Sequence, residues 1–147
     1  GISPDRLIFA PVLPTDLHLA RLPLADLFLD GLPYNAHTTG SDALWAGLPL
    51  ITQTGKAFPG RVATSLLKAV GLPELVTETP EAFETLAIKL ARDPAALKNI
   101  RDKLARQKAG SALFDTARYT RNLESAYCTM WQGWLAGEKP KSFTVKE

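Results

Sequence analysis

Cysteine and histidine are scarce in this sequence. Its 147 residues include one cysteine, Cys128, and two histidines, His18 and His37. One cysteine excludes a disulfide within the chain and any metal site built from several cysteines. Cys128 falls in a predicted late helix, where a buried and inert thiol is the common case. Because the sequence has so few histidines, few residues could activate a nucleophile as a general base. The sequence therefore does not favour a hydrolase.

The sequence also lacks long apolar runs and the common phosphate-binding and hydrolase motifs. Charges and prolines interrupt the apolar stretches, and the N-terminus has no signal-peptide pattern, so we expect no membrane contact and a cytoplasmic location. No predicted strand is followed by Gly-x-Gly-x-x-Gly, and no loop ends in Gly-Lys-Ser/Thr. Gly-x-Ser-x-Gly and zinc-ligand spacings are missing as well. The sequence therefore contains none of these phosphate-binding or hydrolase motifs, and they cannot be used to assign its function.

Charge of one sign is not in marked excess. The formal net charge is +2, with 46% apolar and 22% charged residues, which is typical of a globular protein. Basic residues gather late in the chain without the aromatic partners of a nucleic-acid surface, so we expect no nucleic-acid partner. The length suits one domain, predicted over residues 1–137 with a polar tail at 138–147. Because the sequence begins at Gly1 and enters a predicted strand almost at once, we expect it to be a fragment of a longer chain.

Strand and helix patterns alternate in the first half of the chain. Strands are expected at 6–10, at the short apolar run 27–29, at 49–53 and at 72–77, with helices at 15–24, 38–46 and 61–70. The strand at 6–10 is predicted to be buried. This alternation predicts an α/β fold with a parallel sheet.

Three amphipathic helices are predicted to close the chain, at 80–92, 94–108 and 115–136. The last helix carries Tyr119, Tyr127, Trp131 and Trp134. Aromatic residues at helical spacing first serve packing, so we expect these side chains to be core rather than ligand contacts.

The segment after the second predicted strand contains the polar residues that most clearly indicate a binding site. His37, Thr38 and Thr39 stand where a helix begins, and there the hydroxyls, the unpaired amides and the positive end of the helix dipole suit a diphosphate. The Asp42 carboxylate could accept hydrogen bonds from the two vicinal hydroxyls of a ribose. The alternative is ordinary capping, with Thr39 as N-cap and Asp42 three residues later, which requires no ligand.

Two weaker groups of polar residues lie nearby in the predicted fold. His18 and Arg21 share one face of the first predicted helix, and both side chains can stack on a flat base and donate hydrogen bonds to it. A solvated polar face explains the same spacing. Lys56 and Arg61, in and after the loop at 54–60, could reach a phosphate or only water. Loops at the carboxyl ends of parallel strands are where ligands bind in such sheets.

These residues together resemble a known family. The segments that carry the similarity are Phe9–Val12, His18, Arg21, Leu24–Asp26, Asn35–Pro49, Arg61–Ser65, Leu113–Phe114, Tyr119 and Met130–Trp131. They are similar to the C-terminal catalytic lobe of the O-linked N-acetylglucosamine transferases and the related SPINDLY-type enzymes. The run from His37 to Pro49, which contains His-Thr-Thr-Gly and Leu-Trp-Ala-Gly-x-Pro, is its most specific part.

The resemblance implies an inverting, metal-independent glycosyltransferase of the GT-B kind, in which each of two lobes is Rossmann-like and the C-terminal lobe, followed by helices, holds the nucleotide sugar. Its donor would be UDP-N-acetylglucosamine, its acceptor a protein Ser/Thr hydroxyl, and it would need no cofactor. Expected partners are an N-terminal catalytic lobe and tetratricopeptide repeats of the same chain. The catalytic base would lie upstream of Gly1, so the fragment alone would be inactive. A non-catalytic nucleotide-sugar-binding or scaffold lobe, and a GT-B transferase using another donor such as GDP-fucose, remain alternatives.

The resemblance also implies roles for individual residues. His37 would stabilise the leaving group, and it would hold the diphosphate together with Thr38 and Thr39. The remaining donor contacts would be Asp42 at the ribose and, around the uracil, His18, Arg21 and the backbone near Val12 and Leu13. Animal members of the family carry lysine where this chain has Thr15, so one charged contact near the ribose or base would be absent here.

Overall fold

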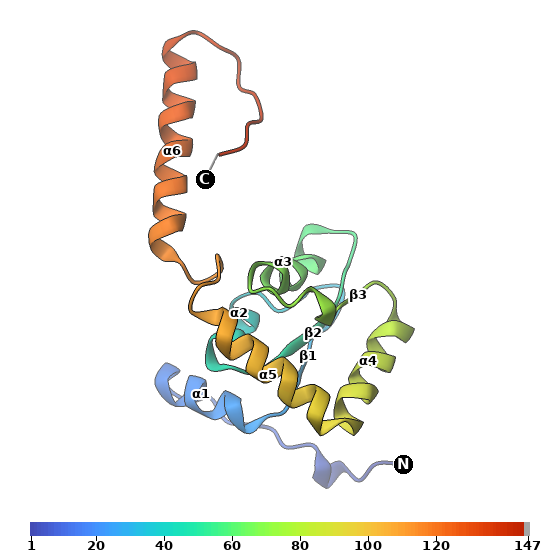
Figure 1. Cartoon of the computed structure of the whole chain (residues 1–147). Helices are drawn as coiled ribbons and strands as arrows, with labels where there is room; N and C mark the ends of the chain where they lie inside the picture. Colours follow the sequence, from blue (N-terminus) through green and yellow to red (C-terminus); the bar gives the residue numbers. More distant parts are fainter. Residues whose placement is uncertain (146–147) are drawn as a thin grey trace.

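A three-stranded parallel sheet forms the centre of the molecule. The computed structural model describes residues 1–145. Its strands run in the order β1 (Phe28–Leu29), β2 (Leu50–Gln53), β3 (Val76–Thr77). Phe28 is paired with Leu50, and Thr52 with Val76. Helices α2 (Thr38–Ala46) and α3 (Val62–Ala69) connect successive strands (Figure 1). The predicted α/β fold with a parallel sheet is confirmed.

A glycine turn joins α2 directly to the central strand. Gly47 has a φ of 88°, a left-handed conformation that costs glycine little because it has no Cβ. The following amide, of Leu48, donates to the Ala43 carbonyl at 2.8 Å, which satisfies one of the last carbonyls of the helix. Pro49 then leads into β2, whose first three residues are buried.

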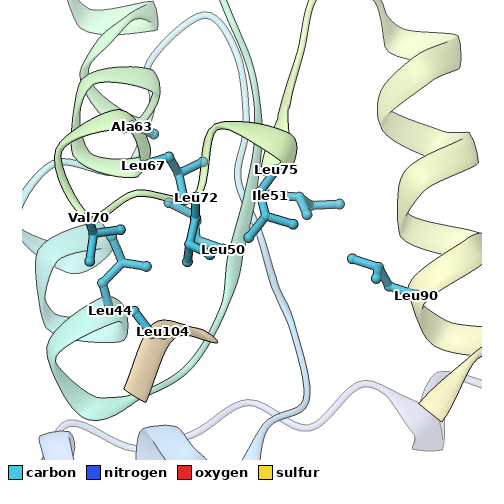
Figure 2. Packing of buried hydrophobic residues seen from close by; sticks show 10 residues of the cluster. All are labelled: Leu44, Leu50, Ile51, Ala63, Leu67, Val70, Leu72, Leu75, Leu90 and Leu104. Carbon is cyan, nitrogen blue, oxygen red and sulfur yellow. The ribbon is translucent and has the colours of Figure 1, made fainter. Parts of the chain in front are cut away.

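The hydrophobic core lies between the sheet and the helices that pack on it. Two of these helices are α4 (Pro80–Arg92) and α5 (Pro94–Lys108), whose ranges agree with the prediction. Their first turns are capped by Thr79 and Asp93, which accept from the amides three residues later. Figure 2 shows the buried cluster, which consists of Leu44, Leu50, Ile51, Ala63, Leu67, Val70, Leu72, Leu75, Leu90 and Leu104.

The predicted buried strand at 6–10 is wrong. Pro4–Arg6 is a 3-10 helix, and residues 7–14 have no regular structure before α1 (Thr15–Arg21) begins. Ile8 and Phe9 are 89% and 90% exposed. A strand needs a hydrogen-bonding neighbour, and within residues 1–145 no other strand lies beside this apolar run.

The expectation that the aromatic residues of the last helix are core is also wrong. Helix α6 (Thr116–Leu135) extends away from the sheet (Figure 1) and has no buried residue. Its four aromatic side chains, Tyr119, Tyr127, Trp131 and Trp134, are 58% to 67% exposed. Cys128 is exposed too, so the expected burial of its thiol is wrong. Helical periodicity identifies an apolar face without specifying what covers it.

The chain after α6 turns back beside that helix. Residues from both segments, including Trp134 and Phe143, line a common hollow. Of the predicted polar tail at 138–147, residues 146 and 147 lie outside the described residues. Among the helices of the described residues, none is both long and apolar enough to cross a bilayer.

Candidate functional site

A hollow of about 500 Å³ opens at the carboxyl end of β1. It is lined by residues 28–31 and 34–39, so its wall is the end of the strand, the following loop and the first turn of α2. Three of the predicted site residues, His37, Thr38 and Thr39, line it together. This is the edge of a parallel sheet at which ligands bind in α/β proteins.

Asp30 ties the loop of this hollow to the central strand. One carboxylate oxygen of Asp30 accepts from the Ala36 amide at 2.7 Å, and the other accepts from the Thr52 hydroxyl at 2.6 Å. Thr52 is fully buried on β2. The two bonds fix the backbone immediately before His37. Sequence reasoning missed Asp30, although an acidic residue directly after an apolar strand was a signal for it.

Asn35 is a second anchor that sequence reasoning did not find. Its side chain is buried, and Nδ2 donates to the Gly31 carbonyl at 3.0 Å and to the Gln53 carbonyl at 3.5 Å. Its backbone amide donates to the Pro59 carbonyl at 3.0 Å. Oδ1 has no hydrogen-bond partner within residues 1–145. Asn35 thus connects the loop at 31–37 to both β2 and the loop at 54–60.

The loops at 31–37 and 54–60 also approach each other closely at Gly60. A Cβ placed on Gly60 would lie 3.1 Å from the Gly55 Cα and 3.2 Å from the Pro33 carbonyl oxygen. These separations are shorter than ordinary van der Waals contact, so larger residues do not fit without a shift of the backbone. This close contact keeps Pro59 beside His37. Pro59 lies in the 3-10 helix Phe58–Gly60.

His37 is held by aromatic and carbonyl groups from both loops. Its ring stacks on Tyr34 with centroids 4.5 Å apart and an 18° angle between the planes. Phe58 meets the ring edge to face at 6.3 Å. Nε2 lies 3.3 Å from the Pro59 carbonyl oxygen, and Nδ1 lies 3.5 Å from the Tyr34 hydroxyl.

The N-terminus of α2 is not capped by a side chain. His37 is the N-cap residue and makes no capping hydrogen bond, while Thr39 is already the second helical residue. The capping alternative, with Thr39 as N-cap and Asp42 as its partner, is therefore wrong. The first amides of a helix lack intrahelical partners and lie at the positive end of the dipole. Thr38 and Thr39 are exposed beside them.

His18 and Arg21 form a separate cluster on α1. The Arg21 guanidinium donates to His18 Nδ1 at 2.9 Å and to the Pro11 carbonyl at 2.6 Å. The second bond ties α1 to the segment that contains Val12, which is exposed, and Leu13, which is half-buried.

The structure does not bring all predicted site residues into one hollow. Within residues 1–145, the lining of the hollow at β1 does not include Val12, Leu13, His18, Arg21 or the half-buried Asp42. Helix α1 packs against α2, so the two groups lie on neighbouring helices. The Arg61 guanidinium donates to the Lys56 carbonyl at 3.1 Å and so is used within its own loop. The described residues contain no group of three or more His, Cys, Asp or Glu that could hold a metal ion.

Taken together, the parallel sheet, the uncapped helix after β1 and the polar loops at its carboxyl edge define an α/β lobe whose hollow lies where such folds bind their ligands. The family follows from comparison with known proteins. The model of glycosyl transferase family 41 matches residues 1–123, and the chain belongs to this family.

Individual relatives agree with this assignment. The chain is 38% identical to the UDP-N-acetylglucosamine–peptide N-acetylglucosaminyltransferase of Caenorhabditis elegans, over 93% of this chain and 12% of that protein. It is 38% identical to an Arabidopsis thaliana protein described as "Probable UDP-N-acetylglucosamine--peptide N-acetylglucosaminyltransferase SEC", over 100% of this chain and 15% of that protein. The chain thus spans a small part of each relative.

A solved structure gives the same result. A mutant of the Thermobaculum terrenum O-GlcNAc transferase superposes with a TM-score of 0.76 at 40% identity, covering 84% of this chain and 24% of that one. The expected family resemblance and the expected fold, one Rossmann-like lobe of a GT-B glycosyltransferase followed by helices, are confirmed.

Proposed function

We propose that this chain is the donor-binding lobe of an inverting protein glycosyltransferase that uses UDP-N-acetylglucosamine and modifies Ser/Thr hydroxyls. The observation that carries the proposal is the hollow at β1, where His37 and Thr38 stand at the uncapped N-terminus of α2 in a family 41 chain. The relatives in C. elegans and T. terrenum are named for this activity.

Each cluster has a distinct part in binding the donor. His37, Thr38 and Thr39 bind the diphosphate through the imidazole, two hydroxyls and the first amides of α2. Asp42 accepts from the ribose hydroxyls. His18 and Arg21, with the backbone at Val12 and Leu13, bind the uracil. Arg21 donates to His18 and to the carbonyl of Pro11, the residue before Val12.

The reaction is a displacement at the anomeric carbon. The acceptor hydroxyl attacks from the face opposite UDP, the bond between the anomeric carbon and the UDP oxygen breaks, and its electron pair leaves on the diphosphate. The proton of the hydroxyl passes to a base supplied from outside this chain. Donors fixed around the diphosphate stabilise the negative charge as it develops, because they need not reorganise during the reaction.

Several parts of the proposal concern the longer enzyme. We expect an N-terminal catalytic lobe and tetratricopeptide repeats in the same polypeptide, a cytoplasmic location and no requirement for a metal. We also expect this chain alone to bind the donor without completing transfer.

Two alternatives make different predictions about ligands. A scaffold lobe without a working site binds no nucleotide sugar, and a transferase with another donor binds GDP-fucose in preference. Isothermal titration calorimetry of the chain with UDP, UDP-N-acetylglucosamine and GDP-fucose separates these two cases from the proposal. A non-catalytic lobe that still binds the nucleotide sugar is distinguished by a transfer assay of the full-length protein, which would then show no transfer. The proposal predicts binding of both uridine nucleotides and weaker or no binding of GDP-fucose. Preference for GDP-fucose, or no binding of any nucleotide, would overturn it.

A further inference from the structure

We propose that Tyr34 is a positioning residue that holds the His37 ring in one orientation toward the diphosphate, a role that rests on the proposed function. Neither the sequence motif nor the comparisons assign Tyr34 a part in the site. Tyr34 lines the same hollow as His37, and it comes from the loop that Asp30 and Asn35 tie to β2.

The first constraint is the stacking of the two rings. Tyr34 covers one face of His37 at 4.5 Å with nearly parallel planes, and Phe58 meets the imidazole at 90°. Offset stacking and edge-to-face contacts are both favourable arrangements for aromatic rings. Contacts with rings from two loops leave His37 little freedom to rotate about its Cβ–Cγ bond.

The second constraint distinguishes the two ring nitrogens. The Pro59 carbonyl oxygen, 3.3 Å from Nε2, can only accept a hydrogen bond, so Nε2 must carry the hydrogen. In the neutral ring Nδ1 then carries the lone pair, and the Tyr34 hydroxyl at 3.5 Å donates to it. Tyr34 therefore fixes both the plane of the ring and, with Pro59, its tautomer.

The arrangement has a consequence for donor binding. The Nε2 hydrogen is used by Pro59, so a ligand can reach only the Nδ1 edge of the ring. A lone pair repels a phosphate, so Nδ1 must take up a proton from solvent as the diphosphate binds, and the Tyr34 hydroxyl then donates to the phosphate beside it. A ring turned by 180° about the Cβ–Cγ bond would put carbon atoms at both nitrogen positions and lose the carbonyl contact and the hydroxyl contact. Tyr34 thus prepares His37 for the diphosphate before the donor arrives.

The test uses Tyr34→Ala, which removes the stack and the hydroxyl, and Tyr34→Phe, which keeps the stack. The matched control is Tyr119→Ala on α6, because Tyr119 and Tyr34 are both 66% exposed. Proton and nitrogen NMR signals of the His37 ring are recorded at alkaline pH, where histidine is neutral. The chain has two histidines, so a His18→Ala spectrum identifies the His37 signals.

We expect Tyr34→Ala to shift the His37 ring protons toward the positions of a solvent-exposed histidine, since the ring-current shift from the stack is lost. Tyr34→Phe should keep that shift but move the Nδ1 signal. Affinity for UDP should fall about fivefold in Tyr34→Ala and about twofold in Tyr34→Phe. Tyr119→Ala should change neither the His37 signals nor the affinity.

The result that overturns the inference is an unchanged His37 ring spectrum in Tyr34→Ala, or a Tyr34→Ala variant that binds UDP as tightly as the wild type. Backbone amide signals of β2 and α3 report whether the variant is folded. If the wild-type chain binds no UDP while Tyr34→Ala still moves the His37 signals, the proposed function fails and the packing of Tyr34 on His37 stands without a role in donor binding.

Discussion

Replacement of Asp30 by alanine should destabilise the molecule and loosen the loop before His37. In the wild type the carboxylate accepts from the Ala36 amide and from the fully buried Thr52 hydroxyl. Alanine leaves both donors without their acceptor. The Thr52 hydroxyl can still turn to the Gln53 carbonyl at 3.4 Å, which compensates part of its loss.

The expected cost follows from these two donors. A buried donor left without an acceptor costs about 1–3 kcal/mol, so the free energy of unfolding should fall by about 2–4 kcal/mol in Asp30→Ala. Asp30→Asn keeps one acceptor oxygen and loses the charge, so we expect a loss of about 1 kcal/mol. With a urea dependence of about 2 kcal/mol per M, the midpoint of Asp30→Ala should fall by about 1–2 M.

Urea denaturation followed by circular dichroism measures these changes. The control is Asp26→Ala before β1, because the Asp26 side chain is 86% exposed and lies 3.6 Å from the Arg101 guanidinium. A surface ion pair of this kind contributes about 0–1 kcal/mol. If Asp30→Ala unfolds at the same urea concentration as Asp26→Ala, the two hydrogen bonds do not anchor the loop and the reasoning is refuted.

Three further substitutions test other contacts. Gly60→Ala should lower the free energy of unfolding by about 1–3 kcal/mol, because its Cβ would lie 3.1 Å from the Gly55 Cα. The control in thermal unfolding is Gly110→Ala, whose Cβ would have nothing within 4 Å. Equal melting temperatures of the two variants would contradict the close contact at Gly60. Leu44→Ala, at a fully buried position, should cost about 2–5 kcal/mol in urea denaturation, and a loss under 1 kcal/mol would argue against this core. Trp134→Ala, on the exposed face of α6, should change unfolding by less than about 0.5 kcal/mol; a larger loss would mean that α6 packs on the rest of the chain.

The parallel sheet and the later helices could be predicted because their signals are local. Gly47 after an apolar helix and the prolines that begin α4 and α5 fix the ends of these elements within a few residues. The same local reasoning failed at Ile8 and Phe9, where the apolar run is as strong but has no strand beside it. It failed for α6 as well, since a stripe of aromatic residues does not determine its partner.

The candidate site was predicted in part for a similar reason. His37 and Thr38 stand in a recognisable motif at a helix start, and the structure places them in one hollow. Asp30, Asn35 and Tyr34 act through contacts with Thr52, Gln53 and His37 that depend on strand pairing and loop conformation. Such contacts join residues up to 22 positions apart, and no spacing rule in the sequence indicates them.

The central claim is that the His37 side chain hydrogen-bonds to the diphosphate of the donor. The most direct measurement compares the affinity of wild type and His37→Ala for UDP and for UMP by calorimetry. A hydrogen bond to a charged group contributes about 1.5–3 kcal/mol, so His37→Ala should bind UDP about tenfold or more weakly. Its affinity for UMP should change far less, because UMP has no β-phosphate. Equal losses for both nucleotides, or unchanged affinity for UDP, would contradict the account.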